Sequence, residues 1–203
     1  MSISANAIKR ARKLFKYYED IHYNACSISA DELLIGGIDF FKKLNKKSNI
    51  IVSLNTLDSN DKPIFLPYKI KKIKGLKVAI IGLTEDTSIT LKNIKIQSPF
   101  KALKKHLSAL VKKSDIIICL TSLNRQQLKL LLAQFPQINI IISSGIGMPT
   151  YVPIKLNQSL IVSSHPKGKS IGLLKLFLDE KKKIKDYSNN IIMLKETNLI
   201  GNF

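Results

Sequence analysis

The sequence predicts an α/β fold, in which mixed sheets are flanked by helices. Helix-like and strand-like segments alternate through the first two thirds of the chain, and strand-like segments dominate the rest. The hydrophobic fraction of 45 % is spread evenly over 203 residues, which is enough to bury a proper core. Because no repeat, linker or low-complexity segment interrupts this pattern, we expect a single domain over residues 1–203.

Helices are expected where apolar residues recur at steps of three and four residues. The first lies within residues 1–22, where the hydroxyl of Ser4 can cap it. The second covers residues 31–44, although Gly36-Gly37 weakens it in the middle. Two further helices are expected, one that begins after Ser98 and one from Gln126 to Gln134.

Strands are expected in short apolar runs bounded by turn residues. The segment LPYKIKKIKGLKVAIIGLT, residues 66–84, predicts two strands that turn at Gly75. The run Asp115–Leu120 is apolar on both faces, as in the middle of a covered sheet. Lys181–Lys183 most simply lie at a hairpin edge, where lysine discourages strand aggregation. Further strands are expected at residues 25–28, 50–54 and 138–142, followed by mainly short strands from Tyr151 to Leu194.

The chain carries a formal net charge of +19 and has an isoelectric point near 9.9. Such a charge is typical of proteins that bind nucleic acid or acidic membranes. The lysines, however, are scattered along the chain among Ile and Asn, without the interleaved aromatic residues of single-strand binders. We therefore expect solvated lysine with weak attraction to anions or nucleotides. A basic surface that binds polyanions such as nucleic acid is the alternative.

Export, membrane and metal-binding signals are not indicated. No apolar run approaches the roughly 18 residues of a membrane span. The start, MSISANAIKRARKLF, becomes polar and basic where a signal peptide needs an unbroken apolar stretch. As written, the chain is expected in the cytoplasm, and outside it if it is part of a longer exported precursor. Cys26 and Cys119 lack metal-ligand spacing, so we expect buried free thiols.

Six segments follow one another in an order and spacing that point to a known family. They are residues 23–36, 53–55, 66–84, 115–124, 135–148 and 160–172. The segment 66–84 is similar to the pattern P-Y-x-I-x-x-x-x-G followed by K-V-x-I-I-G-L-T. The segment 135–148 is similar to V-P-G-I-D-V-I-I-G-G-H-S-H-T. Together the six resemble the 5′-nucleotidase branch of the calcineurin-like metallophosphoesterases, over residues 23–194, with a tail at residues 195–203.

This resemblance implies a four-layer sandwich of two sheets between helices, which here lacks the first strand and its D-x-H motif. Members of the family hold two divalent metal ions that bind phosphate and generate the attacking hydroxide. The family's ligands and catalytic histidine match Ala30, Asp31, Ser122, Gly145 and Gly147. Alanine and glycine have no side-chain donor, so we expect no metal, no cofactor and no catalytic residue. The leading hypothesis is a catalytically silent structural or binding module, whose partner the sequence leaves unknown.

A hydrolase of phosphate esters with a rebuilt site is the alternative hypothesis. It would use Asp31 and Glu32, which are adjacent carboxylates, and His165, whose loop also carries Lys167 and Lys169. The simpler interpretation is that Asp31 and Glu32 cap a helix and that His165 is an exposed loop residue. Two other features are weaker: Ser122 has no base that the sequence reveals, and the turn Ser143–Gly147 could offer main-chain amides to an anion.

Overall fold

The computed structural model describes residues 5–86 and 93–194, and its largest element is a six-stranded mixed sheet with the order β2-β3-β5-β6-β8-β7. These strands are β2 (Tyr68–Ile73), β3 (Leu76–Leu83), β5 (Ile116–Thr121), β6 (Ile140–Ser143), β7 (Ile154–Leu156) and β8 (Ser159–Val162). The inner four run parallel, whereas β2 and β7 are antiparallel edge strands. The predicted mixed α/β fold is confirmed, and the carboxyl ends of the parallel strands share one edge of the sheet.

The predicted turn at Gly75 is the tight connection between β2 and β3. Ile73 pairs with Leu76, so Lys74 and Gly75 are the turn's central residues. Both have positive φ, 49° and 82°, as a type I′ hairpin turn requires. This turn fixes the register of β2 on β3, and thereby which side chains of β2 share a face.

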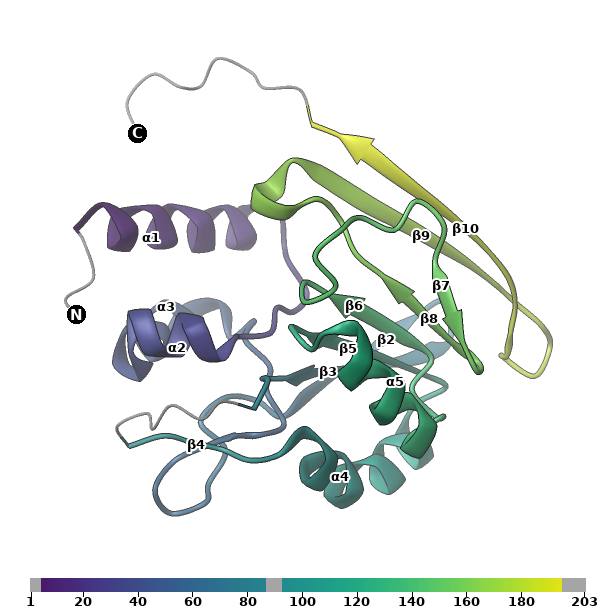
Figure 1. Cartoon of the computed structure of the whole chain (residues 1–203), viewed down its shortest axis with the longest axis horizontal. Coiled ribbons are helices and arrows are strands. Elements are labelled where there is room, and N and C mark those ends of the chain that lie inside the picture. The colour runs from purple at the N-terminus through teal and green to yellow at the C-terminus, as the bar shows by residue number, and fades with distance from the viewer. Residues whose placement is uncertain (1–4, 87–92, 195–203) are drawn as a thin grey trace.

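One face of the sheet is covered by α4 (Pro99–Lys113) and α5 (Arg125–Gln134), which lie on the same side in Figure 1. Pro99 occupies the first turn of α4, and a capping box between Asn124 and Gln127 begins α5. The core between helices and sheet contains Leu103, Leu107, Leu110, Leu128, Leu131 and Leu132 with Ala79, Ile81, Ile117, Cys119 and Ile141. The two predicted helices are therefore confirmed, along with the central strand after Asp115.

A second core lies under α1 (Ala5–Asp20), α2 (Ala30–Gly36) and α3 (Ile38–Ser48). It contains Phe15, Ile28, Leu33, Phe41, Ile50, Ile51 and Phe65. The prediction of one helix over residues 31–44 was wrong. Gly37 has a φ of 69°, which breaks the helix in two, and the second piece continues to Ser48.

The predicted strands at residues 25–28 and 50–54 form only isolated parallel bridges. Cys26 pairs with Ile51, and Val52 pairs with Leu66. The chain changes partner at nearly every residue here, since Val52 donates to the Cys26 carbonyl, Ser53 to that of Leu66 and Leu54 to that of Gly82. Regular ladders need several successive pairs, so these segments do not extend into strands.

The carboxyl-terminal part was expected to hold mainly short strands, and this was wrong for its last two. β9 (Ser170–Leu178) and β10 (Ile184–Met193) form a long antiparallel hairpin, which extends along the side of the molecule in Figure 1. Lys181–Lys183 form its turn and not a strand edge, because Lys182 has a φ of 60° and the Asp179 carbonyl accepts its N–H.

The remaining elements are short: β1 (Thr56–Leu57) pairs with β4 (Lys95–Ile96), and η1 (Pro166–Gly168) precedes β9. The predicted cap Ser4 and the tail at residues 195–203 lie outside the described residues. Within the described part of the chain, no helix has the length and apolar character needed to cross a membrane. Both cysteines are free thiols; Cys119 is buried and Cys26 half-buried.

Candidate functional site

The carboxyl edge of the parallel strands gathers Ala30, Ser122 and Gly145, which the family resemblance singled out, and also Glu85, which it did not. Glu85 follows β3 after Thr84, Ser122 follows β5, and Gly145 follows β6. Ala30 joins them as the first residue of α2. In open α/β sheets, ligands bind outside this edge of the strands, so these loops form the candidate site.

Glu85 holds these loops together. Its Oε1 accepts a hydrogen bond from the main-chain N–H of Ala30 at 2.9 Å, and its Oε2 accepts one from the Ser122 hydroxyl. The carboxylate thus lies at the amino end of α2, where the free N–H groups and the helix dipole favour a negative charge. Two positions matched to metal ligands are thereby joined to each other by an internal side chain.

Gly145 leaves no room for a side chain. A Cβ at this position would overlap the main-chain oxygen of Ser122, whereas one at Gly147 would meet open space. The N–H of Gly145 donates to Ser143 Oγ at 3.0 Å, and that hydroxyl donates to the Leu123 carbonyl at 2.9 Å. Because the N–H of Ser144 also donates to the Thr121 carbonyl, this turn uses the amides of Ser144 and Gly145 internally.

Beneath Glu85 lies a buried network of hydroxyl and amide groups. Asn55 donates to the Thr84 carbonyl at 2.7 Å and accepts from the Thr84 N–H at 2.9 Å. The Thr84 hydroxyl lies 3.0 Å from that of Thr56 and donates to the Ile28 carbonyl at 2.9 Å. Asn55, Thr56 and Thr84 are fully buried, and each is hydrogen-bonded. The network fixes the main chain at Thr84 and so positions Glu85.

Glu32 serves as a helix cap, as the simpler interpretation expected. Its carboxylate accepts from the N–H and the hydroxyl of Ser29 at 2.8 and 2.9 Å, and its own N–H donates to the Ser29 hydroxyl at 3.1 Å. Asp31 lies exposed in the same first turn of α2. Oε2 of Glu32 is therefore engaged in a capping box with Ser29.

His165 is half-buried and hydrogen-bonded, so the expectation of a simply exposed loop residue was wrong. Its Nδ1 lies 3.0 Å from the hydroxyl of Ser170, which also accepts the His165 main-chain N–H at 2.9 Å. Its Nε2 lies 3.4 Å from the Tyr151 hydroxyl. A cavity of about 300 Å³ beside it is lined by Ser163, Ser164, Lys167 and Gly147 among others, while Lys169 is exposed at the end of the loop.

The residues at the candidate site do not fit a two-metal centre. Ala30, Gly145 and Gly147 offer no side-chain donor, and the neutral hydroxyl of Ser122 is already bonded to Glu85. Among residues 5–86 and 93–194, no group of three or more His, Cys, Asp and Glu side chains could hold a metal ion. Asp31, Glu32 and His165 therefore do not converge on a common metal position.

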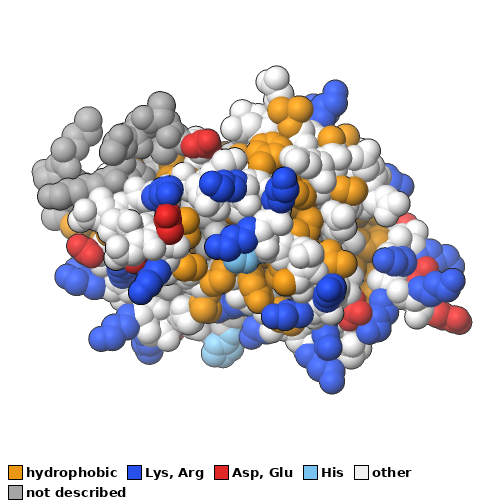
Figure 2. Space-filling model, turned by 90° about the horizontal axis from the view of Figure 1, so that it is seen from below, with side chains coloured by type: hydrophobic (Ala, Val, Ile, Leu, Met, Phe, Trp, Pro, Cys, Tyr) orange, Lys and Arg blue, Asp and Glu red, His pale blue; other side chains and the backbone are white. Residues whose placement is uncertain are grey.

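The opposite face of the sheet is partly open. A cavity of about 680 Å³ lies between the sheet and the segment Tyr23–Ser27, with Ile80, Ile118, Leu120 and Ile142 on its floor. Ile142 is 45 % exposed although it belongs to a central strand. This apolar floor contrasts with the buried face that α4 and α5 cover. Elsewhere on the surface, Figure 2 shows Lys and Arg side chains scattered over one face among apolar and uncharged groups.

The structure is similar to several solved phosphoesterase structures, although no family model and no curated protein matches the sequence. Sulfate thiohydrolase SoxB from Thermus thermophilus has 16 % identity and a TM-score of 0.78, over 92 % of this chain and 36 % of that one. A 5′-nucleotidase precursor, also from Thermus thermophilus, has 22 % identity and a TM-score of 0.73, over 93 % of this chain and 42 % of that one. Calcineurin-like phosphoesterase YfkN from Bacillus subtilis has 18 % identity and a TM-score of 0.72, over 88 % of this chain and 66 % of that one.

These matches confirm, at the level of fold, the resemblance that the sequence motifs indicated. The chain spans only about two fifths of the length of the SoxB and 5′-nucleotidase structures. Over most of its own length, it shares the fold of the 5′-nucleotidase and calcineurin-like metallophosphoesterases.

Proposed function

We propose that this chain is a catalytically silent domain of the metallophosphoesterase fold, which acts as a structural or binding module. The observation that carries the proposal is the Glu85 bridge, in which one carboxylate satisfies the Ala30 N–H and the Ser122 hydroxyl. A metal ion at this edge would have to compete with these hydrogen bonds for the carboxylate. None of the family's histidine positions would offer it an imidazole, because these positions hold Ser122, Gly145 and Gly147.

The packing around Gly145 supports the same proposal. Because a Cβ at Gly145 would overlap the Ser122 carbonyl, a ligating side chain would require the main chain to move. The site therefore differs from that of an enzyme whose metals have simply been removed. At Gly145 the main chain of Ser122 occupies the space that a ligating side chain would need, whereas a Cβ at Gly147 would meet open space.

We further propose that the chain is a single domain and corresponds to a four-layer sandwich without its first strand. The isolated bridges of Cys26, Ile51, Val52 and Leu66 are short parallel pairings of the kind that a second sheet would extend. The open apolar floor beside Ile142 supports this as well, since sheet faces are normally covered.

The experiment is a combined metal and activity assay on the purified chain. After chelation and reloading with Mn²⁺ or Zn²⁺, we expect substoichiometric metal by elemental analysis and no hydrolysis of p-nitrophenyl phosphate or AMP above background. Stoichiometric metal together with hydrolysis would overturn the proposal. The rebuilt-site hypothesis is tested in the same assay with Asp31→Ala, and activity that this variant lacks would establish it.

A further inference from the structure

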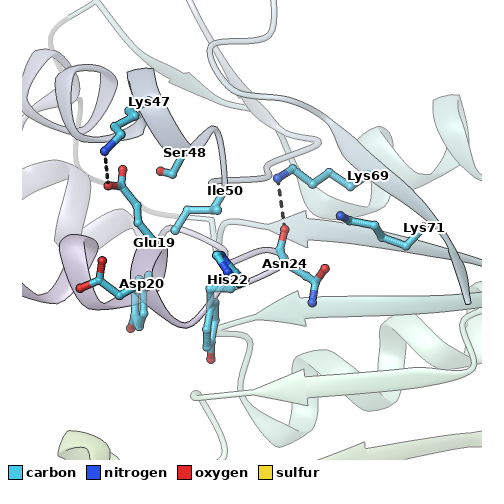
Figure 3. Close-up of a pocket in the computed structure, with 11 residues that line it drawn as sticks. Glu19, Asp20, His22, Asn24, Lys47, Ser48, Ile50, Lys69 and Lys71 are labelled. Carbon is cyan, nitrogen blue, oxygen red and sulfur yellow. Dashed lines mark hydrogen bonds and ion pairs between the residues drawn. The ribbon is translucent and has the colours of Figure 1, made fainter.

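A second polar cavity lies away from the candidate site, beside β2 (Figure 3). Its volume is about 640 Å³, within the range of small-molecule sites. It is lined by the end of α1, the loop after it, the end of α3 and two lysines of β2, Lys69 and Lys71. Lys71 pairs with Val78, five residues before Leu83 at the end of β3, so it lies roughly 17 Å along the sheet from the candidate site.

Lys69 and Lys71 form a pair of cations without a counter-ion. They lie two residues apart on β2, so their side chains project from the same face of the sheet. Figure 3 shows them extending side by side. Lys69 Nζ donates to the Asn24 carbonyl at 3.1 Å, and within the described chain neither lysine forms an ion pair. Burial lowers the pKa of Lys69, and so does the charge of Lys71. Lys69 is half-buried and Lys71 is exposed, and a bound anion would stabilise two like charges that lie side by side.

The carboxylates of the cavity do not neutralise this pair. Glu19 lies 3.5 Å from Lys47 and turns toward it in Figure 3, while Asp20 points away from Lys69 and Lys71. Neither carboxylate is among the groups that shift the pKa of Lys69. The cavity therefore divides into a neutralised half at Lys47 and a cationic half at Lys69 and Lys71.

Ser48 lies in the other half of the cavity. Its Oγ is the one buried side-chain N or O atom of the described residues without a hydrogen-bond partner. Figure 3 shows Ser48 beside Lys47 and apart from Lys69 and Lys71, so its hydroxyl is not assigned to an anion that the two lysines bind.

The helix ends at the cavity oppose an anion only weakly. Carboxyl ends of helices carry about half a negative charge each, through their free carbonyls. At α1, the carbonyls of Tyr17, Tyr18 and Glu19 accept the N–H groups of Ile21, Tyr23 and His22 at 2.8–3.0 Å. At α3, the last turn carries Lys46 and Lys47, which offset its dipole. The full charges of Lys69 and Lys71 therefore dominate their half of the cavity.

We propose that this cavity binds a phosphate-type dianion, either free or as the head of a small ester, at Lys69 and Lys71. Phosphate supplies several acceptor oxygens and a charge near −2 at neutral pH, which matches two ammonium groups. None of these residues matches a metal-ligand position of the family. The proposal is therefore independent of whether the chain retains any catalysis.

The test is a titration of the ¹⁵N-labelled chain with inorganic phosphate at constant ionic strength, followed by amide chemical shifts. We expect saturable shifts at Asn24, Lys69 and Lys71. Lys69→Gln with Lys71→Gln should weaken binding by about tenfold or more, because two charge-assisted contacts are lost. The matched control is Lys72→Gln with Lys77→Gln, an exposed cross-strand pair on the other face of the same hairpin. It should change affinity by less than about twofold.

Two further arms sharpen the result. Ser48→Ala is a second control, because Ser48 lies on the Lys47 side of the cavity in Figure 3, and it should change the affinity for phosphate by less than about twofold. Phenyl phosphate in place of phosphate distinguishes the sources: tighter binding assigns an ester whose ring contacts Tyr23, and equal binding assigns free phosphate. No saturable shift with either probe, or an equal loss of affinity in the lysine double variant and its control, would overturn the proposal.

Discussion

The hydroxyl of Ser122 donates to the carboxylate of Glu85, and this bond joins the loops that follow β5 and β3. The same carboxylate accepts the N–H of Ala30, so α2 is attached to both loops. A single side chain therefore ties the loops after β3 and β5 and the start of α2 to one another through hydrogen bonds.

Glu85→Gln should lower the free energy of unfolding by about 1–2 kcal/mol, because a neutral amide replaces the charged carboxylate that strengthens both hydrogen bonds. Urea unfolding of wild type, Glu85→Gln, Ser122→Ala and the double variant measures the coupling between the two residues. Glu180→Gln is the control, since Glu180 is exposed in the β9–β10 turn and should matter by less than about 0.5 kcal/mol. Strictly additive losses, or equal losses in Glu85→Gln and the control, would contradict the bridge.

Gly145→Ala should destabilise the chain by roughly 1–3 kcal/mol, because its Cβ would overlap the Ser122 carbonyl and force the backbone apart. The matched control is Gly172→Ala in β9, where a Cβ meets nothing within 4 Å. That variant should lie within about 0.5 kcal/mol of wild type. Urea midpoints measure both, and equal stability of the two variants would show that the turn after β6 is loosely packed.

The regular elements could be predicted because their apolar patterns alone determine them. Helix α4 has an apolar stripe with lysines opposite, and β5 is apolar on both faces, so both were predicted close to their observed limits. The break at Gly37 could not be located, since it depends on a positive φ that glycine permits without requiring. The runs at residues 25–28 and 50–54 have strand-like composition, but their partners change too quickly for a ladder.

The missing metal-ligand side chains at the candidate site could be recognised in the sequence, whereas the hydrogen bonds of Glu85 at the same positions could not. Ala30, Ser122, Gly145 and Gly147 could be read directly against the family motif. Glu85 was missed, because its partners Ala30 and Ser122 lie 55 and 37 residues away along the chain. The available signal was a carboxylate that directly follows the strand KVAIIGLT, at the edge where Ser122 was already expected.

Both cysteines should resist modification in the native state. Burial and the nearby Glu32 raise the pKa of Cys26 to about 12, and burial also raises the pKa of Cys119. At about pH 8, a thiol with a pKa of about 12 is a thiolate in roughly one molecule in ten thousand. Ellman's reagent should therefore react slowly with the native chain and promptly with both thiols in denaturant. Cys26→Ser identifies any residual signal, and rapid native reaction that this variant abolishes would show Cys26 to be activated.

The carboxylate of Asp115, which directly precedes β5, contacts both β3 and the turn of the β9–β10 hairpin. It accepts the Lys77 main-chain N–H at 2.8 Å and lies 3.1 Å from Lys182 Nζ at the tip of the β9–β10 hairpin. The hydrogen bond from Lys77, followed by that from Lys182, lowers the pKa of Asp115 below its ordinary value. The ionised form is thus favoured in the folded state, although solvent reaches the carboxylate and the ion pair is screened by salt.

The pKa of Asp115 is lower in the folded state than in the unfolded state, so its carboxylate contacts stabilise the fold fully above the ordinary pKa. This stabilisation disappears as the pH falls through the lowered pKa. Asp115→Asn should therefore melt at a lower temperature than wild type at neutral pH, and the gap should shrink as the pH falls below the ordinary pKa of aspartate, about 3.9. Circular dichroism melts over that pH range measure the gap. Asp86→Asn is the control, because Asp86 is exposed and forms no ion pair with the residues that the structure describes. A gap that is independent of pH would assign the effect of Asp115→Asn to packing, and a gap equal to that of the control would show that the hairpin contact contributes nothing.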